Sequence, residues 1–279
     1  MIFSFYVIIF YLGASIGSFL GVVVDRTITK ESIWKGRSHC DHCRHLLHPF
    51  DLIPIFSFFL LQGECRYCHK KLSLFYPLIE FCTGIVFVII SYVFFGTFLG
   101  LLIQTRYIFL LLYYLILAGT FIVIFFTDLR YGIIPFTVVA VAFLVTILWY
   151  SIFPLFSFTS DEVQTIVLQT NILIALLSAL GAGGFFLLLF LLTKGRGMGF
   201  GDVVYAFLMG FTLGFPRVLL GLYIAFVTGA IISLFLIVMK KKKFKGGTIP
   251  FGPFLVFGTF VSIFWGNAII ATILHYLSV

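Results

Sequence analysis

Long apolar runs joined by short polar segments dominate the pattern of this chain. A helix needs roughly 20 mainly apolar residues to cross the hydrocarbon core of a bilayer. About eight runs approach this length, and they cover residues 2–24, 77–99, 107–127, 133–153, 171–192, 202–216, 217–239 and 253–277. The run at 202–216 is short, as is typical of a tilted helix or of one that ends in a water-filled depression lined by protein. The pattern predicts an all-α polytopic membrane protein of about eight transmembrane helices.

Composition agrees with this fold class, and the placement of charge argues against a nucleic-acid partner. Hydrophobic residues make up 62% of the 279 positions and charged residues 10%, and the mean hydropathy is +1.19. The net charge is +8, but with eight spans and an outer N-terminus all but two of the 18 Lys and Arg, Arg106 and Arg217, fall on one side. By the positive-inside rule that side is cytosolic and both termini lie outside, so the basic residues orient the protein. The first run extends past a signal-peptide core without a basic segment ahead of it, and we expect a retained span.

The long polar segment at 25–76 carries two CxxC pairs. Cys40-x2-Cys43 and Cys65-x2-Cys68 are separated by 21 residues. Two such pairs predict a tetrahedral zinc site, since each pair holds the metal from one tight turn while the spacer closes the loop. Two disulfides are the alternative, which a cytosolic location disfavours because thiols stay reduced there. Four thiolates leave no open position for a substrate, so the metal is expected to be structural.

Other residues of this region add weaker signals. Pro49 and Pro54 break any continuous helix, and the run IPIFSFFLL is too short to span, so an amphipathic element at the membrane interface is expected. Cys82 falls inside the second apolar run and is expected to be a packing residue. Glu80 is either a helix N-terminal charge favoured by the dipole or a functional acid that faces a cavity. Five histidines are alternative metal ligands, although four cysteines already complete the shell: His39, His42, His45, His48 and His69.

Two aspartates stand at the ends of apolar runs in a chain that has only ten Asp and Glu residues. Asp128 follows the third run in FIVIFFTDLRYGIIPF, and Asp202 opens the sixth in KGRGMGFGDVVYAF. Taken alone, Asp128 could cap the next helix or pair with Arg130, and Asp202 could cap its own helix. Both fall on the same predicted inner face, however, and the glycines before Asp202 allow close approach of backbone or substrate. The segment GGTIPFGPFL adds irregular backbone at membrane depth, which persists only inside protein or beside a cavity.

These motifs resemble those of the type IV prepilin peptidases, a family of GxGD-type intramembrane aspartyl proteases. The matching stretches follow the family's order and run over most of the chain: GSFLGVVVDR, the two CxxC pairs around FDLIPIFSFFLLQGECRYC, LFYPLIE, TDLRYGIIP, GMGFGDV and IPFGPFL. The resemblance implies eight spans, a cytosolic zinc-binding loop between the first and second, and an active site at the cytosolic face of the inner or plasma membrane.

The resemblance also implies the chemistry. Asp128 and Asp202 match the catalytic dyad, and the supporting loops contain Gly199, Gly201, Pro250, Gly252 and Pro253. Two carboxylates held close in a poorly hydrated site share a proton. The ionised one then activates a water while the protonated one polarises the scissile carbonyl. The implied substrates are prepilins of type IV pili and pilin-like secretion or competence precursors, whose basic leader is cut after a Gly, and many members then methylate the new N-terminus with S-adenosylmethionine.

Two departures from the family pattern bear on the methyl transfer and on the metal loop. Gly21 stands where members usually have Asn, which removes a hydrogen-bonding group near the inner end of the first span. Asp41 stands where a Pro is usual, and it leaves the metal ligands intact. The chain has no glycine-rich Rossmann unit for the methyl donor, so a donor site would be built from the cysteine loop and neighbouring span ends, with Glu80 as a candidate cofactor-binding residue.

The sequence therefore predicts three parts: a first transmembrane helix at 1–24, a four-cysteine zinc loop at 25–76 and a peptidase domain of about seven helices at 77–279. Expected partners are prepilin-type precursors and the lipid bilayer. A transporter that uses intramembrane acids to relay ions is the rival interpretation. It is disfavoured because both acids lie at span ends and no inverted repeat is evident.

Overall fold

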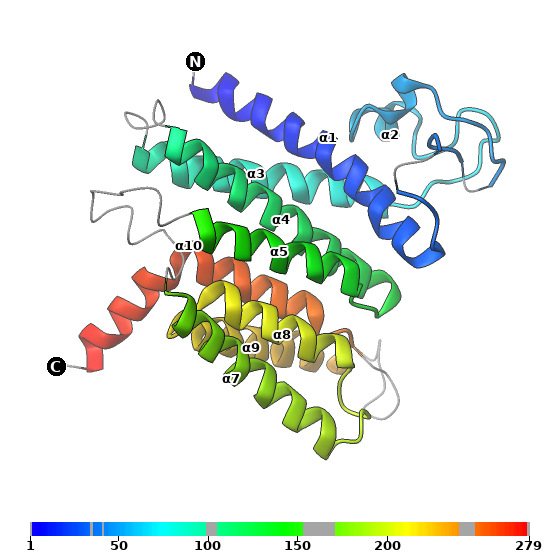
Figure 1. Cartoon of the computed structure of the whole chain (residues 1–279). Helices are drawn as coiled ribbons and strands as arrows, with labels where there is room; N and C mark the ends of the chain where they lie inside the picture. Colours follow the sequence, from blue (N-terminus) through cyan, green and yellow to red (C-terminus); the bar gives the residue numbers. More distant parts are fainter. Residues whose placement is uncertain are drawn as a thin grey trace. The chain divides into compact units, whose positions relative to one another are not determined.

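The computed structural model describes residues 2–33, 36–40, 42–98, 105–152, 171–239 and 249–277, and every regular element in these ranges is a helix (Figure 1). Each of the eight predicted apolar runs forms a helix, which confirms the all-α class. Six of the described helices are long and apolar enough to cross a membrane, whereas α5 and α8 are shorter. The elements are α1 (Ile2–Thr29), η1 (Pro49–Leu52), α2 (Phe56–Leu60), α3 (Phe75–Phe98), α4 (Thr105–Tyr131), α5 (Phe136–Ile152), α7 (Ile172–Leu192), α8 (Phe200–Leu213), α9 (Arg217–Val238) and α10 (Gly252–Leu277).

The chain divides into two compact units, Met1–Phe126 and Thr127–Val279. In the first unit α1 packs along α3 through small residues. A Cβ added to Gly17 of α1 would lie 2.8 Å from Cα of Glu80, and one added to Gly84 of α3 would lie 2.7 Å from the ring of Phe10. Larger residues would force the helices apart, so these glycines allow close packing of α1 against α3.

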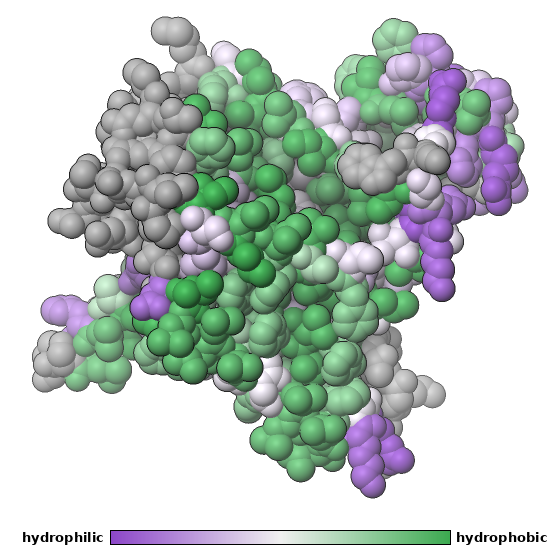
Figure 2. Space-filling view, in the orientation of Figure 1, coloured by the Kyte–Doolittle hydropathy of each residue, from purple (hydrophilic) through white to green (hydrophobic). Residues whose placement is uncertain are grey.

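The segment between α1 and α3 holds only two short helices, η1 and α2. Hydrophilic side chains gather on this segment, while apolar ones cover the helices (Figure 2). Pro49 opens η1, where its missing N–H is tolerated, and Pro54 separates η1 from α2. Phe59 and Leu60 of α2 are 70% and 67% exposed. Exposed apolar side chains of this kind suit an element that lies at a membrane interface.

In the second unit α8 is the central helix. It contacts α5, α7, α9 and α10, and nearly all of its residues from Asp202 to Leu213 are buried. With 14 residues it is about 21 Å long, less than the thickness of a bilayer core. Surrounding helices can satisfy the polar groups at its ends, which is why a short helix is tolerated here. A Cβ on Gly210 would clash with the backbone of Ser178, so α7 approaches α8 closely.

Candidate functional site

Asp128 lies in the last turn of α4, at the start of the second unit. The helix ends three residues later, because Gly132 adopts a positive φ of 65° and its N–H donates to the Asp128 carbonyl at 2.8 Å. The Asp128 side chain is only 5% exposed. Its Oδ2 accepts a hydrogen bond from the backbone N–H of Gly252 at 2.8 Å. A residue 124 positions away thus fixes one oxygen of this buried carboxyl group.

Asp202 is the third residue of α8 and is 7% exposed. Its Oδ2 accepts a hydrogen bond from the N–H of Gly199, the residue before the helix, at 3.1 Å. An acid in the first turn is also favoured by the helix dipole. The capping role considered from the sequence is therefore present, although Asp202 caps from the third helical position. Capping uses one carboxyl oxygen and leaves the other available for chemistry.

The second unit brings the two predicted catalytic aspartates together. Asp128 and Asp202 are close enough to interact electrostatically. The alternative pairing of Asp128 with Arg130 is not found among the described residues, where the guanidinium of Arg130 lies 5.2 Å from the centre of the Tyr131 ring. Two buried carboxyl groups that interact electrostatically can titrate as a coupled pair and share one proton, which is the arrangement that acid–base chemistry at a carbonyl requires.

Two glycines beside the aspartates stand where a larger side chain would not fit. A Cβ on Gly252 would lie 2.6 Å from Asp128 Oδ2, and one on Gly201 would lie 2.9 Å from Cβ of Ile134, in the segment after α4. Both distances are too short for a side chain to fit without displacement. Gly199 differs, since an added Cβ would meet nothing closer than 3.7 Å. Pro250 and Pro253 flank Gly252 at the start of α10, where a helix tolerates proline.

The first unit gathers the four cysteines predicted to bind metal. Their sulfur atoms all lie within 4.8 Å of one another, close enough to ligate one ion. The four thiols form no disulfide. The structure therefore contains a four-cysteine group able to hold a metal: Cys40, Cys43, Cys65 and Cys68.

The two cysteine pairs have the same backbone fold. In the first, the N–H of Arg44 donates to the Cys40 carbonyl at 2.9 Å; in the second, the N–H of His69 donates to the Cys65 carbonyl at 2.9 Å. Arg44 and His69 both have positive φ, 59° and 53°. Burial opposes ionisation of the Cys65 thiol, but backbone N–H groups of Cys68 and Tyr67 and the neighbouring thiols lower its pKa to about 7. Each pair thus points its sulfurs and its N–H groups toward one centre.

The structure also describes the other residues singled out from the sequence of this region, namely the five histidines, Cys82 and Glu80. The five histidines are exposed or half-buried and do not belong to the metal-binding group. Cys82 is half-buried in α3 and free. Glu80 is 8% exposed, and it accepts a hydrogen bond from the N–H of Ile55 at 2.7 Å. It also lines a cavity of the first unit, and a functional role for Glu80 stays a prediction.

Sequence reasoning missed three features near these sites. Asp25 accepts a hydrogen bond from the Tyr76 hydroxyl at 3.0 Å, and Ile55 has an unusual positive φ of 64°. Tyr205, fully buried in α8, donates to Thr259 of α10 at 3.0 Å. The signal for the Asp25 contact is the acid in GSFLGVVVDR, whereas nothing in the sequence marks Ile55.

Comparison with known proteins agrees with this anatomy. Residues 11–94 match the bacterial peptidase A24 N-terminal domain, and residues 115–234 match the type IV leader peptidase family. The chain is 27% identical over 292 residues to a prepilin leader peptidase/N-methyltransferase of Stutzerimonas stutzeri, which covers 95% of this chain and 92% of the relative. The Bacillus subtilis protein of that name is 27% identical over 264 residues, covering 95% of this chain and 96% of the relative.

A third relative with the same name, from Legionella pneumophila, is 28% identical over 251 residues, covering 88% of this chain and 78% of the relative. No solved structure matches the chain significantly. The two family matches fall on the two halves that carry the cysteines and the aspartates, and together they extend over most of the sequence. The chain belongs to the type IV leader peptidase family.

Proposed function

We propose that this protein is a membrane-embedded aspartic endopeptidase that removes the short basic leader from type IV prepilins or pilin-like precursors. The observation that carries the proposal is the buried pair of Asp128 and Asp202, which interact electrostatically within the second unit. Both residues fall inside the segment that matches the leader peptidase family. The rival transporter function has no support from the relatives, which are named as peptidases.

The proposed mechanism uses the two carboxyl groups as one acid–base unit. The ionised carboxylate removes a proton from a water molecule, which attacks the scissile carbonyl carbon, while the protonated carboxyl donates a hydrogen bond to the carbonyl oxygen. The N–H groups of Gly252 and Gly199 each hold one carboxyl oxygen. These bonds orient the pair and leave one oxygen of each group to meet water and substrate. We therefore assign Gly252, Gly199 and Gly201, with the flanking Pro250 and Pro253, to the supporting loops.

We further propose an eight-span arrangement in the inner or plasma membrane, with both termini outside and the aspartates and cysteine loop at the cytosolic face. The distribution of Lys and Arg supports this orientation. α5 and α8 are the two spans that are shorter than a bilayer requires, and the burial of α8 supports its inclusion. A cytosolic site would meet the leader where the apolar helix of the precursor leaves the bilayer.

The metal of the cysteine loop is proposed to be Zn²⁺ in a structural role. A tetrahedral zinc with Zn–S bonds of about 2.3 Å places its sulfurs about 3.8 Å apart, and the Cys40 and Cys68 sulfurs lie 3.9 Å apart. Bound zinc would join the two cysteine pairs and so help to fold the loop.

We propose that the protein also methylates the new N-terminus, because the relatives carry N-methyltransferase in their names. S-adenosylmethionine is then the methyl donor, and Glu80 is the candidate residue that binds it. A Cβ at Gly21 would meet Ile79 at an ordinary contact distance of 3.5 Å, so the α1–α3 packing does not itself require a glycine at this position.

The decisive experiment replaces each aspartate with asparagine and offers the purified protein a pilin-type precursor with and without S-adenosylmethionine. Product masses report cleavage and methylation separately. Asp128→Asn and Asp202→Asn should each lower cleavage by about 10²–10⁴-fold or more, with the protein still folded and inserted. Asp161→Asn, from the polar segment predicted between two spans, serves as the matched control. Full cleavage by either single dyad variant would overturn the assignment.

A further inference from the structure

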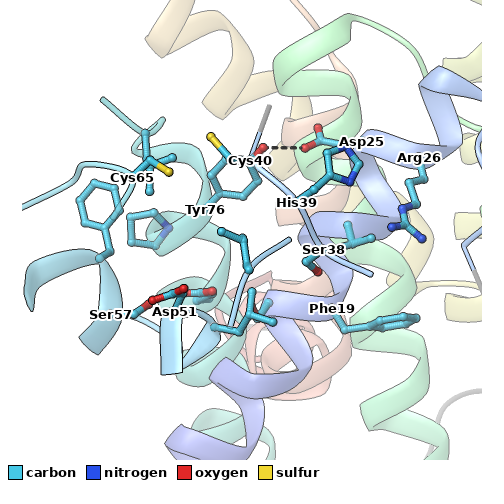
Figure 3. Close-up of a pocket in the computed structure, with 18 of the residues that line it drawn as sticks. Phe19, Asp25, Arg26, Ser38, His39, Cys40, Asp51, Ser57, Cys65 and Tyr76 are labelled. Atoms are coloured by element: carbon cyan, nitrogen blue, oxygen red, sulfur yellow. Dashed lines mark hydrogen bonds between the residues drawn. The ribbon is translucent and has the colours of Figure 1, made fainter. Parts of the chain in front are cut away.

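Asp51 of η1 lies close to the metal-binding cysteines, although it does not belong to the four-cysteine group itself. Its side chain is only 3% exposed, and it lines the same cavity of the first unit as Cys40 and Cys65 (Figure 3). A buried carboxyl group is costly unless it is paired or hydrogen-bonded. The partners of Asp51 therefore indicate what its burial serves.

Two of these partners come from the second cysteine pair. Oδ1 of Asp51 lies 2.7 Å from Nε of Arg66, so the two side chains form an ion pair. Oδ2 of Asp51 accepts a hydrogen bond from the Tyr67 hydroxyl at 3.4 Å. Arg66 and Tyr67 are the two residues between Cys65 and Cys68. One buried carboxylate thus holds both side chains of the turn that carries these two sulfurs.

The same turn directs backbone donors at one of the sulfurs. The N–H groups of Tyr67 and Cys68 hydrogen-bond to the Cys65 sulfur, and such bonds favour the thiolate form that binds metal. Because Asp51 holds the side chain of Tyr67, the backbone of this residue has less freedom to turn away from the sulfur. Asp51 can therefore influence the geometry around Cys65 through the residues that lie between the two ligands.

The contacts continue from the second cysteine pair to the first. The ring of His45 lies against the ring of Tyr67, with 3.7 Å between the ring centres and an angle of 34° between the planes. The carbonyl of His45 accepts a hydrogen bond from the N–H of Cys40 at 3.0 Å. A continuous set of contacts therefore runs from Asp51 through Tyr67 and His45 to a ligand of the first pair.

Asp51 is itself held in place by the start of η1. Its N–H donates to the His48 carbonyl at 2.8 Å, and its Oδ2 accepts a hydrogen bond from the His48 N–H at 3.1 Å. An acid at the third helical position that reaches back to the N-cap in this way stabilises the start of a helix. The carboxylate thus has a fixed position from which it holds the cysteine turn.

We propose that Asp51 is a positioning residue of the metal centre, which holds Arg66 and Tyr67 so that the second cysteine pair meets the first in ligating geometry. The inference rests on the proposed zinc site and adds the residue that orients its ligands. Contacts that orient metal ligands from outside the ligand set typically contribute about 10–100-fold to metal affinity. Here they bring the sulfurs together before the metal binds, so less ordering is needed at binding.

Asp51→Asn separates this role from the fold of η1. Asparagine keeps an acceptor oxygen for the His48 N–H, but it lacks the charge that pairs with Arg66. The guanidinium left behind is 52% exposed, so water can solvate it and no buried charge is left unpaired. Glu64→Gln is the matched control. It removes the same charge directly beside Cys65, and Glu64 forms no ion pair among the described residues.

The test measures the zinc affinity of the full-length protein in detergent, by competition with a chelator of known affinity. Asp51→Asn should weaken zinc binding about 10–100-fold, whereas Glu64→Gln should leave it unchanged. Cobalt(II) reports the ligand set through its absorption bands. At saturation the bands of Asp51→Asn should equal those of the unaltered protein, because all four cysteines remain, but saturation should need more cobalt. Circular dichroism should show equal helix content in all variants.

Arg66→Gln tests the route by which Asp51 acts. If Asp51 acts through Arg66, the protein with both substitutions should bind zinc no more weakly than Arg66→Gln alone. Independent, additive weakening by the two substitutions would contradict this route.

Equal zinc affinity of Asp51→Asn and the unaltered protein would overturn the inference. An equal loss with Glu64→Gln would also overturn it, because the effect would then be one of charge in general. Altered cobalt bands at saturation or a lower helix content would show that Asp51→Asn changes the ligand set or the fold, which likewise rejects a positioning role. Absence of zinc binding by the unaltered protein would instead reject the proposed metal site, and precursor cleavage by the same preparation reports the aspartyl site separately.

Discussion

Gly252 donates a backbone hydrogen bond to Asp128 and, because it has no side chain, leaves room for the Asp128 carboxyl group. Its N–H donates to Asp128 Oδ2 at 2.8 Å, and an added Cβ would lie 2.6 Å from the same oxygen. The first residue of α10 therefore orients the carboxyl group and also leaves the room that this oxygen occupies. The glycine is required here by space and not by an unusual backbone angle.

Replacement of Gly252 by alanine should therefore impair cleavage while leaving both aspartates in place. The added methyl group would push the Asp128 carboxyl away from its bond, and a displacement of about 1 Å in a catalytic group can cost about 10²-fold in rate. The rate of leader removal from a pilin-type precursor measures the effect. Gly184→Ala in α7 is the matched control, because a Cβ there meets nothing within 4 Å. Equal rates for the two variants would contradict a positioning role for Gly252.

The two glycines of the GFGD stretch should respond differently to alanine. At Gly201 the new Cβ would lie 2.9 Å from Cβ of Ile134, whereas at Gly199 its nearest neighbour is 3.7 Å away. Overpacking of a well-packed site costs about 1–3 kcal/mol. We expect Gly201→Ala to lower both the melting temperature in detergent and the cleavage rate, and Gly199→Ala to change them little. The reverse order would show that Gly199 serves the substrate and not the packing.

Much of the site could be predicted because its residues break the local pattern. Asp128 and Asp202 are charges at the ends of apolar runs, where charge is costly, and the cysteine pairs have the spacing of a metal site. The link from Gly252 to Asp128 spans 124 positions, so the sequence marks the segment as irregular without giving its partner. The shortness of α8 likewise becomes understandable only from the helices that surround it.

Glu80 shows why the rest was not accessible from sequence. Its position near the start of α3 is equally consistent with a dipole interaction and with a functional acid. Its actual partner is the N–H of Ile55, presented by a turn that no residue preference would predict, since isoleucine disfavours positive φ. Long-range contacts and strained backbone decide the role of such a residue, and neither can be predicted from the hydrophobic pattern.

The hydrogen bond between Tyr205 and Thr259 should stabilise the second unit. It joins α8, which carries Asp202, to α10, which carries Gly252, and both side chains are fully buried. Tyr205→Phe removes the hydroxyl and keeps the ring, and Thr259 retains its own bond to the Leu255 carbonyl at 2.7 Å. We expect a loss of about 0.5–1.5 kcal/mol in the free energy of unfolding, measured by thermal unfolding in detergent. Tyr223→Phe on α9, where the ring is 67% exposed, is the control and should change nothing.

Removal of the metal should affect the two units unequally. The cysteines belong to the first unit, and both aspartates belong to the second. Elemental analysis should find about one zinc per chain after mild purification without chelator. Cys65→Ser should abolish this zinc and lower the melting temperature, because the loop loses one of its metal ligands. Precursor cleavage should be largely retained, because both aspartates lie in the other unit. Cys82→Ser, at the half-buried cysteine of α3 outside the metal group, should retain full zinc. If Cys65→Ser kept its zinc, the four-thiolate site would be wrong. If it lost cleavage together with its zinc, the metal loop would also be needed to assemble the aspartyl site.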